Sequence, residues 1–182
     1  MHKKINRKGM LLAADLCVFL VLLFVDQFTK HLAILHLKDK APFVLIEGVF
    51  EFRYLENRGS AFGLLQGRKV FLLVVGLLFM ALLLYLLFCL PTGKRFIPLH
   101  ICLSAIVAGG LGNMIDRFRF DYVVDFFYFV LIDYPIFNVA DCYIVVATIV
   151  LFVCFLFVYR DEDLAFFSFH RKAGAGNRKE AK

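Results

Sequence analysis

Long apolar runs separated by short polar stretches dominate the sequence. A bilayer core about 30 Å thick requires about 20 apolar residues of helix. Four stretches meet or approach this length, and each is predicted to be a transmembrane helix: residues 9–27, 70–90, 96–116 and 136–159. The pattern indicates a mainly α membrane protein that forms one integral membrane domain over residues 1–182.

The first run also fits a cleaved signal peptide, because a basic start precedes an apolar stretch. Against cleavage, Asp15 and Leu16 rather than small residues precede Cys17, and apolar sequence continues beyond it. The run is therefore expected to stay in the membrane, with Asp15 near the depth of the lipid headgroups.

The connection over residues 28–69 carries a strand pattern. Residues 49–56 alternate bulky and charged side chains, which is the period of a half-buried strand, and the apolar Phe43–Ile46 precede them. A small β-containing extracytoplasmic subdomain of two or three strands is predicted here, between the first two helices and resting on the membrane. Residues 117–135 are expected to form an extracytoplasmic loop, and residues 160–182 a basic cytoplasmic tail.

Composition and charge agree with a membrane protein. Hydrophobic residues make up 62% of the chain and charged residues 20%, whereas soluble domains contain about 45–50% apolar residues and disordered chains are poor in them. The net charge is +6 at pH 7, but the basic residues cluster toward both ends, which favours lipid headgroups over nucleic acid as the partner. The basic, acid-free start predicts a multi-pass topology with both termini cytoplasmic.

The cysteines and histidines do not indicate a metal site. None of the 5 cysteines belongs to a C-x-x-C pair, and no Cys/His cluster has zinc-ligand spacing. The cysteines fit the role of small hydrophobic residues in helices. The sequence therefore predicts no metal and no cofactor.

Polar residues crowd those ends of the apolar runs that face one side of the membrane. In a four-helix topology, the end of the first run, the start of the second, the end of the third and the start of the fourth share a side. The clusters found there are Asp26–Lys30, Asn57–Gly63, Gly109–Arg117 and Phe137–Asp141. Ionisable groups at membrane depth are costly unless paired, so these clusters contain candidate functional residues.

Several of these residues also have a purely structural interpretation. Asp26 and Lys30, four residues apart, suit an ion pair on one helix face, which either supports a site or only anchors the helix end. Asp116 and Arg117 either hold the loop or, through the Arg117 guanidinium, bind a substrate carbonyl or a headgroup. The glycine-rich stretch that begins at Gly109 permits close helix packing as readily as ligand approach.

Asp125 and Asp141 form a sharper pair. Asp125 has apolar neighbours on both sides, and Asp141 begins a long uncharged run three residues after Asn138. The loop between them is short enough to fold back on one cavity, where two nearby carboxylates share one proton. One carboxylate then activates water while the other protonates a carbonyl oxygen, as in an aspartic protease. Spacing alone does not distinguish this pair from two unrelated aspartates or from an ion or proton pathway.

Five motifs in order resemble the bacterial lipoprotein signal peptidase family, signal peptidase II. They are Asp26-x-x-x-Lys30, Asn57-x-Gly59-x-Ala61-Phe62, the glycine-rich stretch from Gly109 to Asn113 with Asp116-Arg117, Val123-Val124-Asp125-Phe126, and Phe137-Asn138-x-Ala140-Asp141. Motif order, spacing and the number of apolar runs agree from about residue 10 to residue 160.

The resemblance implies an inner-membrane aspartic endopeptidase that removes signal peptides from prolipoproteins, cutting just before a cysteine that carries diacylglycerol. It assigns the catalytic roles to Asp125 and Asp141. The residues that it implies in substrate binding or in support of the site are Asp26, Lys30, Asn57, Gly59, Ala61, Phe62, Gly109, Asn113, Asp116, Arg117, Asn138 and Ala140. The expected partners are diacylglyceryl-prolipoproteins and membrane lipids, and the expected enzyme is a monomer with its site near the outer leaflet.

The main rival class is a small transporter or proton-conducting protein, which also places carboxylates at membrane depth. Such a protein is expected to distribute polar residues through both halves of the membrane and to contain internal repeats. Here the clusters gather on one side and no repeat is visible. A non-catalytic subunit packed through the glycine-rich helix would not need apolar neighbours at Asp125 and Asp141.

Overall fold

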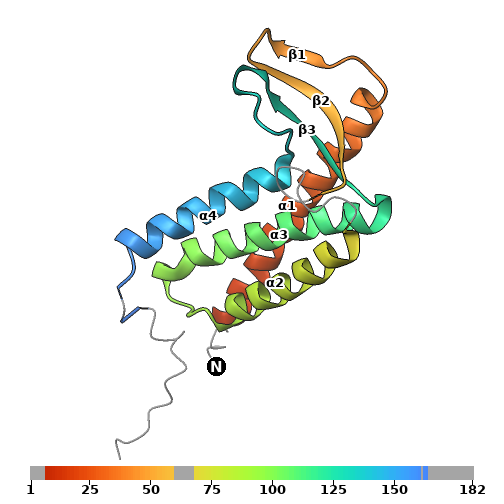
Figure 1. The fold of residues 1–182 in the computed structure, drawn as a ribbon. Helices are drawn as coiled ribbons and strands as arrows, with labels where there is room; N and C mark the ends of the chain where they lie inside the picture. Colours follow the sequence, from red (N-terminus) through yellow and green to blue (C-terminus); the bar gives the residue numbers. More distant parts are fainter. Residues whose placement is uncertain (1–6, 60–67, 161, 164–182) are drawn as a thin grey trace, which may run out of the picture.

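The body of the protein is a group of four long helices. A computed structural model describes residues 7–59, 68–160 and 162–163. Its long helices are α1 (Arg7–Leu37), α2 (Lys69–Cys89), α3 (Ile97–Phe120) and α4 (Val139–Phe157). Each is long and apolar enough to cross a membrane, which confirms the prediction of a mainly helical protein with four such helices (Figure 1).

Helix α3 lies between α2 and α4 (Figure 1) and packs against α1 as well. In its most apolar stretch 61% of the residues are buried within the protein, against 11–17% in the other three helices. The other helices instead expose large apolar side chains, such as Phe24, Leu78 and Phe157. A helix that is apolar on its outer face as well as its inner one fits a lipid surrounding.

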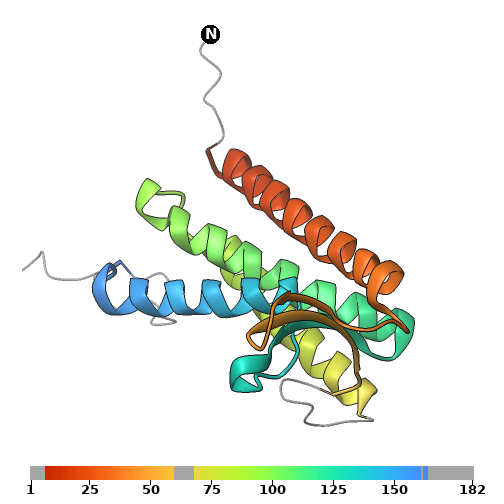
Figure 2. The same cartoon turned by 90° about the horizontal axis from the view of Figure 1, so that it is seen from above.

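A three-stranded antiparallel sheet lies across one end of the helices (Figures 1 and 2). Its strands, in spatial order, are β1 (Phe43–Ile46), β2 (Phe50–Asn57) and β3 (Val123–Phe129). The β2–β3 register pairs Leu55 with Asp125 and Asn57 with Val123, so Asn57 and Asp125 come to the same end of the two strands. A short helix η3 (Val130–Ile132) follows β3, and another, η2 (Lys94–Phe96), precedes α3.

Strand β3 corrects the sequence prediction, because it lies within the stretch 117–135 that is predicted to be an extracytoplasmic loop. The sheet therefore joins two segments on either side of α2 and α3, rather than residues 28–69 alone. The first four residues of β3 are all buried, and a strand buried on both faces shows no alternation of polar and apolar residues.

The helix ends also differ from the predicted ones. Helix α1 continues to Leu37 instead of ending at residue 27. The charged residues that seemed to end it are buried against α3, and beyond them Ala33 packs against Val124 and Phe126 of the sheet. Helix α3 extends four residues beyond the predicted range 96–116, and α4 is shorter at both ends than the predicted range 136–159.

Asp15 is turned into the protein rather than toward an exposed surface. It is 6% exposed, and its Oδ2 lies 2.8 Å from Nδ1 of His100 in α3. A histidine 85 residues away in the sequence thus gives Asp15 a buried partner within the protein.

Candidate active site

Asp141 is fixed by the way in which α4 begins. Asn138 precedes the helix in an extended conformation, and its side-chain oxygen accepts a hydrogen bond from the Asp141 amide at 3.1 Å. Asp141 Oδ2 in return accepts from the Asn138 amide at 3.1 Å. Two backbone donors at the helix start are thus satisfied reciprocally, and the Asp141 carboxylate is held at the first turn.

Asp125 reaches the same place from the sheet. Its side chain is 1% exposed, and its two oxygens accept hydrogen bonds from Asn57 Nδ2 at 2.9 Å and from Asn138 Nδ2 at 2.6 Å. Asn138 therefore contacts both aspartates. Asp125 and Asp141 line one cavity, so the structure brings together the two residues that the sequence singles out as a pair.

Asn113 of α3 completes the surroundings of the two carboxylates. Its Nδ2 donates to Asp141 Oδ1 at 2.9 Å. Its Oδ1 accepts from Lys30 Nζ at 2.8 Å and from Asn138 Nδ2 at 3.1 Å. Because both partners of the oxygen are donors, the amide orientation is determined, and its NH₂ group is directed at Asp141.

Burial raises the pKa of Asp125 to about 7, and the nearby charge of Asp141 acts in the same direction. The hydrogen bonds from Asn57 and Asn138 and the charge of Lys30 act in the opposite direction. A carboxyl group with such a pKa exchanges its proton near neutral pH, as a general acid or base requires.

A buried ion network lies directly behind these residues. Lys30 Nζ lies 3.0 Å from Asp26 Oδ2 and 3.0 Å from Asp116 Oδ2. All three side chains are at most 3% exposed. A buried charge is tolerated only when it is paired and hydrogen-bonded, and this network meets the condition by joining α1 to α3.

The two acids of the network also position the elements that carry the aspartate pair. Asp26 Oδ1 accepts from the Ala140 amide of α4 at 3.1 Å, and Asp116 Oδ2 accepts from the Val124 amide of β3 at 3.2 Å. Gln27 was not among the predicted site residues, yet its Nε2 donates to both acids at 3.1 Å. Its only sequence signal is its place within the polar cluster Asp26–Lys30.

Two glycines of α3 allow neighbouring elements to approach that helix closely. A Cβ atom on Gly109 would lie 2.6 Å from the Ala140 carbonyl oxygen, and one on Gly112 would overlap Asp26 Oδ2.

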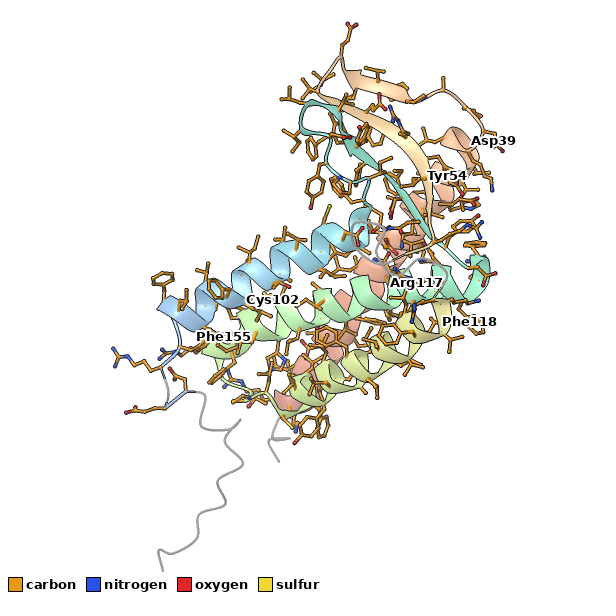
Figure 3. All side chains as sticks on the ribbon, viewed as in Figure 1. Asp39, Tyr54, Cys102, Arg117, Phe118 and Phe155 are labelled. Carbon is orange, nitrogen blue, oxygen red and sulfur yellow. The ribbon has the colours of Figure 1, made fainter. Side chains whose placement is uncertain are left out.

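The region where α3 meets the sheet carries Arg117 (Figure 3), whose Nη2 donates to the Gly59 carbonyl at 2.9 Å. The predicted site residues Ala61 and Phe62 lie outside the described residues.

The cavity has a polar end and an apolar body. Its volume is about 510 Å³. Asn57, Asn113 and Arg117 join the two aspartates at the polar end. The apolar body runs between α2, α3 and α4, and its wall includes Leu72, Val75, Met80, Leu83, Ile106 and Ile144. These apolar residues carry no chemical signature in the sequence, since lipid-facing and cavity-facing side chains of a spanning helix are alike.

Within the described residues, no group of three or more His, Cys, Asp and Glu side chains is arranged to hold a metal ion. Among the described residues, the polar side chains that line the cavity are Asp125, Asp141, Asn57, Asn113, Arg117 and Tyr134.

Comparison with solved structures and known sequences gives a consistent result. One solved structure, described as a bacterial membrane enzyme studied by the in meso method, superposes with a TM-score of 0.71 and 27% identity, over 86% of this chain and 92% of that one. The family model of signal peptidase (SPase) II matches residues 18–157.

Curated relatives support the same assignment. The lipoprotein signal peptidase of Clostridium tetani is 36% identical over 157 residues, which is 85% of this chain and 99% of the relative. That of Caldanaerobacter subterraneus is 41% identical over 128 residues, 70% of this chain and 86% of the relative.

These matches and the four spanning helices define a multi-pass membrane enzyme of the aspartic peptidase class. More particularly, the chain belongs to the signal peptidase II family, the lipoprotein signal peptidases. The family removes signal peptides from prolipoproteins, and this membership decides against the rival interpretation as a transporter or proton-conducting protein.

Proposed function

We propose that Asp125 and Asp141 hydrolyse the peptide bond that precedes a diacylglyceryl-modified cysteine in prolipoproteins. The observation that carries the proposal is the common cavity of two carboxylates whose four oxygens all accept hydrogen bonds from Asn57, Asn113 or Asn138. The amides hold both carboxyl groups in place at one cavity, and two nearby carboxylates in a buried site cannot both be ionised cheaply, so we infer that the pair holds one proton.

The environments of the two acids suggest their roles. Asp141 lies at the first turn of α4 and serves as the base that takes a proton from water. Asp125, with a pKa of about 7, carries the shared proton and donates it to the carbonyl oxygen. The hydroxyl adds to the carbonyl carbon and gives a tetrahedral diol. The C–N bond then breaks as the proton held by Asp141 passes to the amine of the leaving cysteine, and one hydroxyl proton of the diol returns to Asp125 as the C=O bond re-forms.

The shape of the cavity supports a lipidated, membrane-bound substrate. An apolar body that continues from the carboxylates along α2 suits the apolar segment of a signal peptide or an acyl chain. All four polar clusters meet at the end of the helices that carries the sheet. We infer that this end faces the outer leaflet of the bacterial cytoplasmic membrane, that both termini are cytoplasmic and that the enzyme acts as a monomer on its lipid-held substrate.

The test compares wild type with Asp125→Asn and Asp141→Asn in a gel-shift assay on a lipidated precursor. Each substitution is expected to abolish cleavage without unfolding the protein, because it removes the proton exchange but keeps the side-chain shape. Asp39→Asn is the matched control. Asp39 is exposed beyond the end of α1 (Figure 3) with φ 58°, a conformation that asparagine also adopts.

The same assay includes the precursor without its lipid. Cleavage is expected only for the lipidated form, since the lipid anchor presents the bond to the site. Turnover in either Asn variant at normal expression contradicts the roles of the pair, and equal processing of the unlipidated precursor contradicts the proposed substrate.

A further inference from the structure

Three of the four buried residues of helix α1 are charged. Its buried residues are Asp15, Asp26, Lys30 and Ala33, out of 31 in the helix. Large apolar side chains of the helix, such as Leu20, are exposed. Apolar contacts between helices gain little in a bilayer because lipid is equally apolar, so polar pairs and close packing decide which helix faces meet.

Asp15 and His100 form a polar contact that the active site does not use. The carboxylate lies 2.8 Å from Nδ1 of the imidazole, and Nε2 of the same ring lies 3.4 Å from the Pro91 carbonyl oxygen. Both side chains are less than 9% exposed. Neither residue lines the cavity of the two aspartates, so the contact has no direct part in the chemistry.

This contact and the active-site network hold α1 and α3 at one register. Asp15 meets His100, and Gln27 Nε2 donates to the Gly112 carbonyl at 3.2 Å; in both pairs the partners are 85 residues apart. The two contacts are separated by about 18 Å along each helix. The helices therefore run parallel with an unchanged offset, and a slide of α1 by one turn, about 5.4 Å, would break both contacts.

We propose that Asp15 and His100 are a positioning pair that sets the register of α1 against α3 and thereby holds Asp26 and Lys30 in the active site. The proposal rests on the proposed function of that site. A slide of α1 reaches the chemistry through named contacts: Asp26 holds the Ala140 amide at the start of α4, and Lys30 orients the Asn113 amide.

The test uses the full-length enzyme with Asp15→Leu, His100→Leu, the double Leu variant and the exchanged pair Asp15→His/His100→Asp. For each, kcat and KM are measured on the lipidated precursor, together with the midpoint of thermal unfolding in detergent. A single Leu variant leaves one polar group buried without its partner, so it is expected to lower both the midpoint and kcat.

The double Leu variant separates positioning from stability. It leaves neither of the two side-chain positions with an unpaired polar group, so its midpoint is expected to return near that of wild type. Its kcat is expected to stay roughly 10- to 100-fold lower, since small misplacements at a catalytic site cost that much, while KM changes little because the cavity is intact. The exchanged pair is expected to recover most of kcat. A double Leu variant with wild-type kcat, or a folded exchanged pair no better than the single variants, overturns the proposal.

A distance measurement provides a readout that does not depend on activity. Spin labels at the exposed positions Leu20 of α1 and Ile101 of α3 are introduced after replacement of the native cysteines. The double Leu variant is expected to broaden or shift the distance distribution, and an unchanged distribution contradicts the proposal.

If the Leu variants do not fold, Asp15→Asn is measured instead with the same readouts and the same criteria. A wild type that cleaves no lipidated precursor would refute the proposed function but would leave this measurement valid.

Discussion

Neutral amides, rather than cations, make most of the direct contacts with the two aspartates. Asn57 and Asn138 donate to Asp125, and Asn113 donates to Asp141. An amide offers a hydrogen bond to a carboxylate without adding a full charge, so it orients the group while leaving it able to bind a proton. The cation Lys30 is engaged by Asp26, Asp116 and the Asn113 oxygen and contacts the pair only through that amide.

Asn57→Ala tests how one amide hydrogen bond affects proton binding by Asp125. The Asn57 hydrogen bond lowers the pKa of Asp125, so its removal is expected to raise that pKa further. The proposed acid must be protonated, and activity therefore falls as the pH rises through its pKa. The alkaline limb of the kcat/KM profile, expected near pH 7 in wild type, should move to higher pH in the variant.

Glu56→Gln is the control for this change, because Glu56 precedes Asn57 in β2 but pairs with Lys38. Its pH profile is expected to match that of wild type. An Asn57→Ala profile that stays in place, or moves to lower pH, would refute the stated influence of the amide on Asp125.

At this scale the sequence predicts the residues but not all of their partners. Asp125 and Asp141 are recognisable because apolar residues flank them. Gln27 and the pairing of Asp15 with His100 are not, since both depend on how α1 lies against α3. No local pattern reports a contact between residues 85 positions apart.

At the scale of elements, the close approach of three helices determines where the site forms. Gly109 lets α3 contact the start of α4, and Gly112 lets it contact α1 at Asp26. The loss of helix propensity at a glycine, about 1 kcal/mol relative to alanine, is offset here by the contacts that the missing side chains permit.

Gly112→Ala is expected to destabilise the protein and reduce activity severely, because the new Cβ would overlap the Asp26 carboxylate. Overpacking of this kind typically costs about 1–3 kcal/mol. Gly110→Ala is the matched control, since its Cβ would meet only the flexible end of Met80 at 3.1 Å. Thermal unfolding midpoints and cleavage rates of both variants check this, and equal midpoints would contradict the packing argument.

Elements that depend on local sequence could be predicted, whereas elements that depend on contacts between distant residues could not. The helices were predictable because the bilayer demands a length that apolar runs reveal. Strand β3 and the last turns of α1 were not, because both are stabilised by packing between Ala33, Val124 and Phe126, which come from distant parts of the chain.

On the scale of the whole molecule, the two aspartates come from elements of different kinds that must be brought together. Asp125 arrives on a strand whose partner, β2, precedes α2, and Asp141 arrives on α4. The ion network of Asp26, Lys30 and Asp116 joins α1 and α3 and contacts the backbone of both elements. The bundle thus acts as a frame that holds the two aspartates at one cavity.

The proposal that Asp125 holds a proton shared with Asp141 is tested most directly by the pH-dependent infrared difference spectrum of the purified enzyme in detergent. We expect a carboxylic acid C=O band that disappears as the pH rises through about 7 and that is missing from Asp125→Asn but retained in the control Asp39→Asn. Persistence of the titrating band in Asp125→Asn, or its absence from wild type, would contradict a shared proton held on Asp125.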